Sequence, residues 1–426
     1  MSVVRTLIVA DGYPWPTSSG YAIRLVNHIA ALAELGPIDL FINVWQSRAS
    51  FYQPPEGLLS RFKVVTRAET PKGIRLQLLR LRAIATPWVP RRLSIASDRK
   101  VLAEFLDWVQ PPYDLAMIVR AGPYVRFRDL VKAPLIIDID DLESSKLSEQ
   151  LRTRSPDYFG PAHYLAARSK GFLDAWEVNR WRRLERTMAK DAQAVLVCSK
   201  LDKQRLGVPN CVVIPNGYEP IASIKREATM HPPTLTYIGL MKYDPNCDGA
   251  LFLVDKVLPK IRSEVPEVDV RIVGMFDSRF EPIMGRPNVT VTGFVEDLAL
   301  ELSRADVAVV PLRFGSGTRI KILEAFAYGI PVVSTPVGCE GLCAHDGEHL
   351  LIADGPDAFA AACVRLLRSR SDRIRIGNAG HRLWEQRFRW PTIRRRLADL
   401  ATAVVNNKLP FNTDGIESVR AVVDPT

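Results

Sequence analysis

Short apolar runs alternate with longer amphipathic stretches along most of this chain. The runs are too short for helices and rich in Val, Ile and Leu, which is typical of strands buried in a parallel sheet. They cover residues 6–10, 40–44, 115–119, 135–139, 194–198, 235–239, 270–273, 307–311 and 331–334. Helical patterns lie between many of them, at residues 21–35, 176–190, 247–262, 319–328 and 357–368. This alternation predicts βαβ units, in which helices cover both faces of a parallel sheet.

The length of the chain, 426 residues, is more than one compact core usually holds and favours two or three domains. A turn-rich stretch at residues 215–233 precedes a fresh strand and is therefore the best candidate for a linker. We predict an α/β fold with two doubly wound, Rossmann-like domains facing a cleft. In such sheets ligands bind beyond the carboxyl ends of the strands, so we expect the functional residues there.

Composition places the chain among ordinary globular proteins, because 47% of its residues are hydrophobic and 24% are charged. These values exclude extended disorder, collagen and a coiled coil. The net charge of +10 suggests an anionic partner, whether nucleic acid, a phosphate ligand or acidic lipid. The excess is concentrated in residues 61–100 and 365–396, each of which holds eleven Lys and Arg against two Asp and Glu, while the remainder is net acidic.

Cysteine usage and the N-terminus bear on the compartment. The six cysteines show no metal-ligand spacing, so we interpret them as buried thiols of a reducing cytosol: Cys198, Cys211, Cys247, Cys339, Cys343 and Cys363. Residues 3–10 form a strand pattern without the features of a signal peptide. No apolar run reaches the ~18 residues of a membrane span. We therefore expect a soluble, cytoplasmic protein.

The densest chemical signal is a strand, a Gly-rich loop and a helix that follow one another in residues 309–335. Free amides at the helix N-terminus suit a phosphate. Arg313, Arg319 and Lys321 add positive charge, and Glu324 can hydrogen-bond a diol such as ribose. The alternative is a structural turn with solvated arginines, since a Gly-rich loop alone is a weak signal.

This stretch closely resembles the signature of retaining glycosyltransferases with the GT-B fold, in the large family that uses nucleotide-diphosphate sugars (glycosyltransferase family 4-like, "glycosyl transferases group 1"). The pattern G-x-G-x-R-x-K-x-x-E-A of one subset is satisfied by Gly315, Gly317, Arg319, Lys321, Glu324 and Ala325. Glu324 matches the second Glu of the family's Glu-x7-Glu, which holds the ribose hydroxyls. Ser316 stands where the first Glu would fall, so backbone groups of residues 315–318 can hold the donor sugar instead.

The resemblance covers nearly the whole chain. Residues 11–24 look like the family's N-terminal glycine loop near the donor phosphates, although Ser18, Ser19 and Gly20 also suit an ordinary helix N-cap. Residues 237–246 resemble its first donor-domain strand and loop, and residues 291–295 the loop that contacts the base. The implied donor-binding residues are Gly20, Gly239, Lys242, Phe294, Arg313, Gly315, Ser316, Gly317 and Thr318, and the implied catalytic residues are Lys321, Arg319 and Glu324.

The resemblance also implies how the chain is divided. We predict a Rossmann-like acceptor-binding domain at residues 1–215 and a Rossmann-like nucleotide-sugar-binding domain at residues 216–385. Residues 386–426 would form a C-terminal helix that crosses back to the first domain, followed by a tail. Residues 365–396 look like the family's terminal helices, so much of their charge has a structural interpretation.

An acidic cluster, Asp138, Asp140 and Asp141, follows a predicted strand of the acceptor domain. Its Asp-x-Asp string is the metal-chelating pair of a different glycosyltransferase fold, and adjacent carboxylates suit Mg²⁺ or Mn²⁺ in principle. GT-B enzymes usually manage without a metal, so we predict no metal and no cofactor. We expect these carboxylates to orient sugar hydroxyls of the acceptor. Many relatives carry a His near here, but His163 alone follows this cluster closely, and a surface position suits it better.

The resemblance implies transfer of a sugar from a UDP- or GDP-sugar to an acceptor hydroxyl, with retained anomeric configuration, in cell-envelope polysaccharide or glycolipid assembly. The expected acceptor is a lipid-linked sugar or another glycan. Residues 73–82 mix Arg with Leu as an interfacial helix does, which suggests that residues 61–100 rest on the anionic cytoplasmic face of the inner membrane. A solvated basic face is the alternative.

Two other classes of function stay open. The same fold occurs in nucleotide-sugar 2-epimerases, and it would also suit a non-catalytic nucleotide-sugar binder. A nucleic-acid-binding protein could use the same arginines, but the chain lacks aromatic stacking motifs, so we predict that nucleic acid is not a partner.

Overall fold

The computed structural model describes residues 3–17, 19–45, 53–67, 89–94, 99–152, 171–220, 232–315 and 319–407. The chain divides into two compact units. The first comprises Met1–Pro215 and Arg394–Thr426, and the second comprises Asn216–Ile393. Each unit contains a parallel sheet with helices between its strands, so the predicted α/β class with two Rossmann-like units is confirmed.

Seven described strands form the sheet of the first unit, in the order β3-β2-β1-β4-β5-β6-β7 with parallel neighbours. They are β1 (Thr6–Ala10), β2 (Ile38–Trp45), β3 (Arg61–Arg67), β4 (Leu115–Val119), β5 (Leu135–Asp140), β6 (Ala194–Val197) and β7 (Cys211–Val213). Every residue of β1 and β4 is buried, as the apolar runs predict. The hydrophobic pattern does not reveal β3, because this edge strand alternates basic and apolar side chains.

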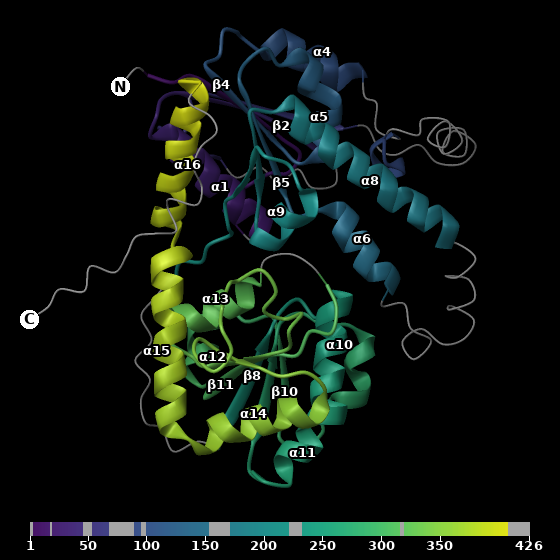
Figure 1. The fold of residues 1–426 in the computed structure, drawn as a ribbon, viewed down its shortest axis with the longest axis vertical. Helices are drawn as coiled ribbons and strands as arrows, with labels where there is room; N and C mark the ends of the chain where they lie inside the picture. Colours follow the sequence, from purple (N-terminus) through teal and green to yellow (C-terminus); the bar gives the residue numbers. More distant parts are fainter. Residues whose placement is uncertain are drawn as a thin grey trace, which may run out of the picture. The chain divides into compact units, whose positions relative to one another are not determined.

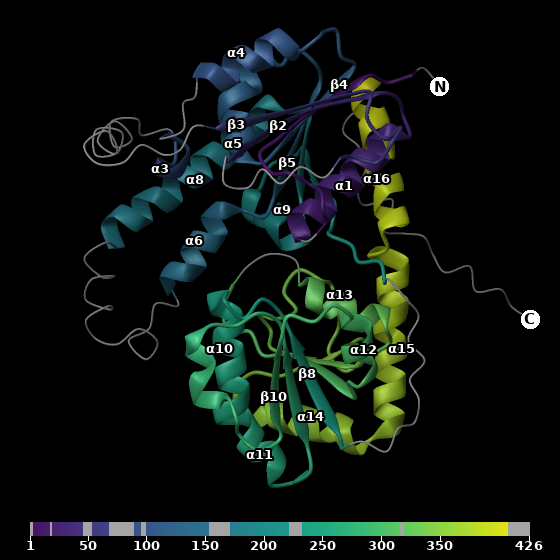
Figure 2. The same ribbon diagram turned by 180° about the vertical axis from the view of Figure 1, so that it is seen from behind.

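Helices cover both faces of this sheet. They are α1 (Gly20–Ala33), α3 (Arg91–Ser94), α4 (Arg99–Trp108), α5 (Ala121–Phe127), the 3₁₀ turn η2 (Arg128–Leu130), α6 (Glu143–Arg152), α8 (Gly171–Asp191), α9 (Lys200–Leu206) and α16 (Trp390–Val405). Figures 1 and 2 show α1 on one face, with α5 and α8 on the other. Arg394 of α16 donates from Nε to Oδ1 of Asn27 in α1, at 2.8 Å, so the C-terminal part of α16 packs beside α1.

The second unit repeats the same doubly wound strand order, β10-β9-β8-β11-β12-β13, again with parallel neighbours. Its strands are β8 (Thr234–Ile238), β9 (Asp269–Val273), β10 (Val289–Gly293), β11 (Val307–Val310), β12 (Val332–Ser334) and β13 (Leu351–Ile352). The chain leaves β8 toward one edge and returns to β11 on the other side of β8. Ligands of doubly wound sheets bind at such a switch point, beyond the carboxyl ends of the two strands.

The helices of the second unit are α10 (Asp244–Phe252), the π turn η3 (Leu253–Val257), α11 (Leu258–Arg262), the 3₁₀ helix η4 (Ser278–Ile283), α12 (Leu298–Ser303), α13 (Ile320–Ala327), α14 (Pro356–Arg368) and α15 (Arg370–Arg387). The helix predicted at residues 247–262 is therefore three consecutive helical segments. Figure 1 shows α10 on one side of the sheet and α13 and α15 on the other. No helix among the described residues is both long and apolar enough to cross a bilayer.

Several arginines of the second basic segment have partners within the second unit. Arg365 pairs with Asp372 at 2.8 Å, Arg368 with Glu264 at 2.8 Å and Arg389 with Glu219 at 2.7 Å. These contacts agree with the structural interpretation of residues 365–396. In the first segment Arg61 and Lys63 of β3 are also paired, with Asp39 and Glu104. The Arg- and Leu-rich residues 73–82 lie outside the described residues.

One cysteine differs from the prediction. Five of the six are buried free thiols, whereas Cys343 is exposed. It adopts a positive φ of 51° two residues after Gly341, which also has a positive φ, in a segment outside the helices and strands.

Candidate active site

The loops that follow β8 and β11 meet beyond the carboxyl end of the second unit's sheet. Lys321, in the first turn of α13, donates from Nζ to Oδ1 of Asn246 at 2.6 Å. Asn246 donates from its amide to the carbonyl of Leu240 at 3.0 Å, which ties it to the β8 loop. A Cβ on Gly239 would lie 2.8 Å from the Asn246 amide nitrogen and 3.2 Å from Lys321 Nζ. Position 239 therefore has room only for glycine. Because glycine has no side chain, the backbone lies next to the Lys321 amine, as a diphosphate site requires.

Lys321 and Glu324 lie one turn apart on α13, and the pKa values of both side chains are shifted toward the neutral forms. Burial lowers the pKa of Lys321 to about 7, with a further lowering by the Arg319 guanidinium. Burial also raises the pKa of Glu324 to about 7, against the opposing effect of Lys321. Burial thus disfavours the charged forms of both side chains, which is common in sites that bind a charged or polar ligand.

Arg319 shapes the glycine-rich loop from within. Its side chain is 5% exposed, and it donates from Nη2 to the carbonyl of Gly315 at 2.6 Å and from Nε to the carbonyl of Val337 at 3.2 Å. Gly315 has a φ of +113°, which a residue with a Cβ would adopt under strain. Arg319 thus holds the loop and adds positive potential beside Lys321.

Arg313 lies before this loop and is partly exposed. It forms a bidentate pair with the buried Asp248, with nitrogen–oxygen distances of 3.0 and 2.5 Å. Asp248 belongs to α10, so this pair joins the segment after β11 to the helix after β8. The predicted residues Ser316, Gly317 and Thr318 lie outside the described residues.

The loop after β8 is braced by Arg279, which the sequence does not single out. Its guanidinium donates to Asp244 at 2.7 Å, to the carbonyl of Lys242 at 2.8 Å and to Asp277 at 2.9 Å. Lys242 itself is exposed beside this cluster. A fork of donors that fixes two loops is a typical use of arginine, but a single arginine between acidic residues carries no motif that would reveal it.

An apolar ledge extends along the same edge of the sheet. Phe294, predicted to contact the base, follows β10 and is 73% exposed. Leu240 after β8 and Met275 after β9 are about half exposed, and the amide of Met241 donates to the Met275 carbonyl at 2.8 Å. Large apolar side chains at the ends of three adjacent strands offer a surface for a planar ring.

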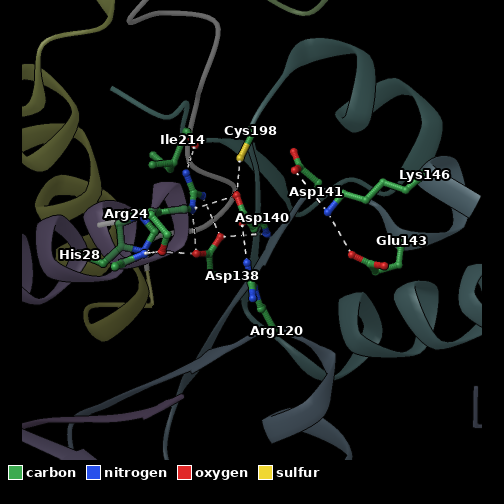
Figure 3. Close-up of polar contacts among 12 residues, drawn as sticks. Arg24, His28, Arg120, Asp138, Asp140, Asp141, Glu143, Lys146, Cys198 and Ile214 are labelled. Carbon is green, nitrogen blue, oxygen red and sulfur yellow. Dashed lines mark hydrogen bonds and ion pairs between the residues drawn. The ribbon is translucent and has the colours of Figure 1, made fainter. Parts of the chain in front are cut away.

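The acidic cluster of the first unit divides into two environments, drawn in Figure 3. Asp138 is fully buried, and Arg24 donates to both of its oxygens, at 2.9 and 2.7 Å. His28 lies 3.4 Å away, and burial lowers the pKa of this histidine to about 4. Arg24 also donates to the carbonyl of Ile214 at 2.8 Å. Asp138 has no exposed surface, so the prediction that it contacts acceptor hydroxyls is wrong. Only Asp140 and Asp141 of the cluster can make such contacts.

Asp140 and Asp141 face a second environment. Asp140 accepts from Cys198 at 3.0 Å and lies 3.4 Å from Arg120, and guanidinium groups hold its pKa well below the usual range. Burial and the neighbouring Asp140 raise the pKa of Asp141 to about 6, although Lys146 lies 3.4 Å from it. Among the described residues, Oδ1 of Asp141 is buried without a hydrogen-bond partner.

These two carboxylates line a cavity of about 180 Å³ within the first unit. The loops after β1, β4 and β5 contribute Asp11, Arg120 and Asp141, and α8 contributes Trp181 and Glu185. Carboxylates, cations and an indole in one small cavity suit a polyhydroxylated ligand, because each hydroxyl both donates and accepts. Gly20, at the start of α1, does not line this cavity.

Asp140, Asp141 and Cys198 also place three candidate metal-ligand atoms within 4.8 Å of one another. Arg24, Arg120 and Lys146 already neutralise the two carboxylates. Burial raises the pKa of the Cys198 thiol, so it does not supply a thiolate. A divalent cation would have to compete with these three cations, which favours the prediction that the site holds no metal.

Comparison with known proteins bears on the second unit. Residues 232–369 match the family model described as "Glycosyl transferases group 1". The match falls within the second unit. The matched residues include Gly239, Asn246, Lys321 and Glu324, so the site described above lies within the matched segment.

Relatives agree with the group 1 match. The phosphatidyl-myo-inositol mannosyltransferase of Mycobacterium tuberculosis is 30% identical over 200 residues, which are 43% of this chain and 52% of that protein. The chain thus spans about half the length of the curated relatives it matches.

Solved structures agree with the fold of the whole chain. Sucrose-phosphate synthase from Thermosynechococcus elongatus is similar with a TM-score of 0.65 and 17% identity, covering 95% of this chain and 100% of that one. The Anabaena protein Alr3699/HepE, solved with UDP and glucose, is similar with a TM-score of 0.60 and 15% identity, covering 94% and 100%. The GT-B fold is thereby confirmed.

Proposed function

We propose that this chain is a glycosyltransferase that moves a sugar from a nucleotide-diphosphate sugar to an acceptor hydroxyl with retained configuration. The observation that carries the proposal is the approach of Lys321 Nζ to Gly239, within a domain that matches the group 1 family. The diphosphate would lie against the bare backbone at Gly239 and the Lys321 ammonium, while Glu324 accepts from the ribose hydroxyls. Phe294 and its apolar neighbours would hold the base.

The bound donor would restore the charged forms that burial disfavours. A diphosphate beside Lys321 favours its ammonium, and the ammonium in turn favours the Glu324 carboxylate. As the bond between the anomeric carbon and the phosphate oxygen breaks, negative charge develops on the diphosphate, where Lys321 and the potential of Arg319 stabilise it. The acceptor oxygen bonds to the anomeric carbon on the same face, and its proton passes to the leaving phosphate oxygen. The products are the glycosylated acceptor and a nucleoside diphosphate.

The donor would be a UDP- or GDP-sugar and the acceptor a sugar- or polyol-bearing molecule of the cell envelope. A similar relative acts, by its name, on phosphatidyl-myo-inositol, and Alr3699/HepE is solved with UDP. The cavity at Asp140 and Asp141 supports a hydroxylated acceptor, and we extend the proposal to a cytoplasmic site of action on anionic lipid, through residues 61–100.

Thermal stabilisation by a panel of UDP- and GDP-sugars tests the donor half, because a ligand that binds the folded state raises the unfolding temperature. The stabilising sugar is then incubated with lipid-linked and soluble acceptors. We expect transfer to an acceptor hydroxyl with retained configuration, and its loss in Glu324→Ala with an unchanged circular dichroism spectrum. Epimerised donor without acceptor, or stabilisation without turnover, would replace transfer with epimerisation or with binding alone.

A further inference from the structure

A second and larger cavity of the first unit has a different chemistry. It has a volume of about 360 Å³ and lies among α6, α8 and α9, with α8 packed against both other helices (Figure 2). Its lining combines hydroxyls, guanidinium groups and two carboxyl groups: Leu142, Ser144, Ser145, Ser148, Glu149, Arg182, Glu185, Arg186, Arg205 and Leu206.

The spacing of the residues puts these groups on facing helix surfaces. Arg182 and Arg186 are four residues apart on α8, and Ser144, Ser145 and Ser148 lie within about one turn of α6. Residues three or four apart share one face of a helix. Two guanidinium groups therefore line one wall and the hydroxyls of Ser145 and Ser148 line the other, as phosphate oxygens require, whereas the Ser144 hydroxyl donates to Glu185.

The two carboxyl groups of the lining do not cancel this positive charge. Glu185 is buried, and Ser144 donates to both of its oxygens, from the amide at 3.0 Å and from Oγ at 2.6 Å. Burial raises the pKa of Glu185 to about 7, so it is partly protonated at neutral pH. Glu149 accepts from Arg205 at 3.4 Å. Arg182 contacts the amide oxygen of Asn179 at 3.4 Å, and Arg186 forms no ion pair among the described residues.

Glu185 lines both this cavity and the one that holds Asp140 and Asp141. Chain neighbours also alternate between them, since Asp141 and Glu143 line the smaller cavity while Leu142 and Ser144 line the larger. A positive pocket thus adjoins a pocket suited to hydroxyls, within one unit.

We propose that the pocket formed by Arg182, Arg186, Ser145 and Ser148 binds the phosphate of a phosphorylated sugar or polyol whose hydroxyls reach Asp140 and Asp141. The proposal rests on the proposed function in treating this ligand as the acceptor. The phosphate ester can be a soluble molecule or a lipid headgroup, and the two sources share the same chemistry at the pocket.

Isothermal titration of the full chain with glucose 1-phosphate, glucose and inorganic phosphate tests the pocket, with UDP and GDP present in excess to occupy a donor site. We expect glucose 1-phosphate to bind more tightly than either fragment. Arg182→Gln combined with Arg186→Gln should weaken its binding ~10- to 100-fold, because each guanidinium supplies a charge-assisted hydrogen bond. The control is Arg183→Gln with Lys190→Gln, which removes the same charge from the same helix but outside the cavity lining. This variant should bind glucose 1-phosphate as tightly as the wild type.

Equal affinity in the Arg182/Arg186 variant, or no binding of the ester by the wild type, would overturn the proposal. Co-sedimentation with phosphatidylcholine vesicles, with and without phosphatidylinositol, separates the sources. Loss of phosphatidylinositol-dependent binding in the variant supports a lipid headgroup, and loss of ester binding alone supports a soluble one. Nucleotide binding is measured separately, so failure of the donor half of the proposed function leaves this result interpretable.

Discussion

The two sheets share one strand order, but the charged groups beyond their carboxyl edges are paired differently. In the first unit Arg24 satisfies both oxygens of Asp138 and lies 3.7 Å from Asp140, and guanidinium groups lower the pKa of Asp140. In the second unit Lys321 has an amide oxygen as its hydrogen-bond partner, and the pKa values of Lys321 and Glu324 both move to about 7.

The difference in pairing indicates that the Arg24–Asp138 pair stabilises the fold, whereas the groups around Lys321 are available to bind a ligand. A buried ion pair with complete hydrogen bonds has little to gain from a ligand and much to lose when one partner is removed. A buried cation without a matching anion is costly until an anion arrives. One topology thus carries a paired network around Arg24 and Asp138 in one unit and an incomplete one around Lys321 in the other. Four substitutions test this contrast.

The largest effect is expected for Arg24→Ala, which leaves Asp138 buried without its counter-ion. The free energy of unfolding should fall by about 3–5 kcal/mol, measured by urea denaturation. Lys63→Ala is the control, because it removes a partner of a surface pair whose side chains are 40% and 34% exposed and should cost less than ~1 kcal/mol. Comparable small losses in both variants would show that the Arg24 network is not the scaffold.

Lys321→Met should act on catalysis and leave the fold intact. We expect turnover of the donor sugar to fall ~10²- to 10³-fold, since a donor of positive charge to the leaving diphosphate is lost. Stability should hold or rise, because a desolvated amine is replaced by an apolar side chain. Lys256→Met, at an exposed position of η3, should leave both quantities unchanged; a stability loss without a rate loss at position 321 would contradict the site.

Gly239→Ala tests the close approach of backbone and cation. The new Cβ would push against the Asn246 amide and Lys321 Nζ, so kcat/KM for the donor should fall ~10- to 100-fold through misplacement of the site. Gly347→Ala provides the comparison, because Gly347 has a φ of +71° and nothing within 4 Å of a Cβ. That change should cost about 1 kcal/mol of stability and leave kcat/KM unaltered, an expectation that a donor defect in Gly347→Ala would refute.

The smallest effect is a shift in pH dependence. The ammonium of Lys321 is present below its pKa of about 7 and is lost as the pH rises through that value. The profile of kcat/KM, which reports the free enzyme, should therefore decline above about pH 7. Asn246→Asp places a carboxylate beside Nζ, favours the ammonium and should move the decline up by about one pH unit. Ser263→Asp, at an exposed site of the same unit, should not move the decline. An unshifted profile in Asn246→Asp would show that Lys321 is not the group whose titration limits kcat/KM.

Much of the architecture can be predicted from the sequence, because central parallel strands are buried on both faces and appear as continuous apolar runs. The edge strands β3, β7, β10 and β13 escape this reasoning. Strand β3 alternates basic and apolar side chains, β10 alternates Val with Thr, and β7 and β13 have only three and two residues. The glycine-rich signature likewise locates Lys321 and Glu324, because their spacing along α13 is local and a family pattern records it.

Only the tertiary structure decided which charged side chains pair with one another to stabilise the fold and which can contact a ligand. Arg24 and Asp138 are 114 residues apart and Lys321 and Asn246 are 75 apart, so no local pattern relates them. The sequence alone predicted three equivalent carboxylates, whereas folding buried Asp138 under Arg24 and left Asp140 and Asp141 lining a cavity. The physical reason is that charge and residue type are properties of the chain, while desolvation and pairing depend on which segments the fold brings together.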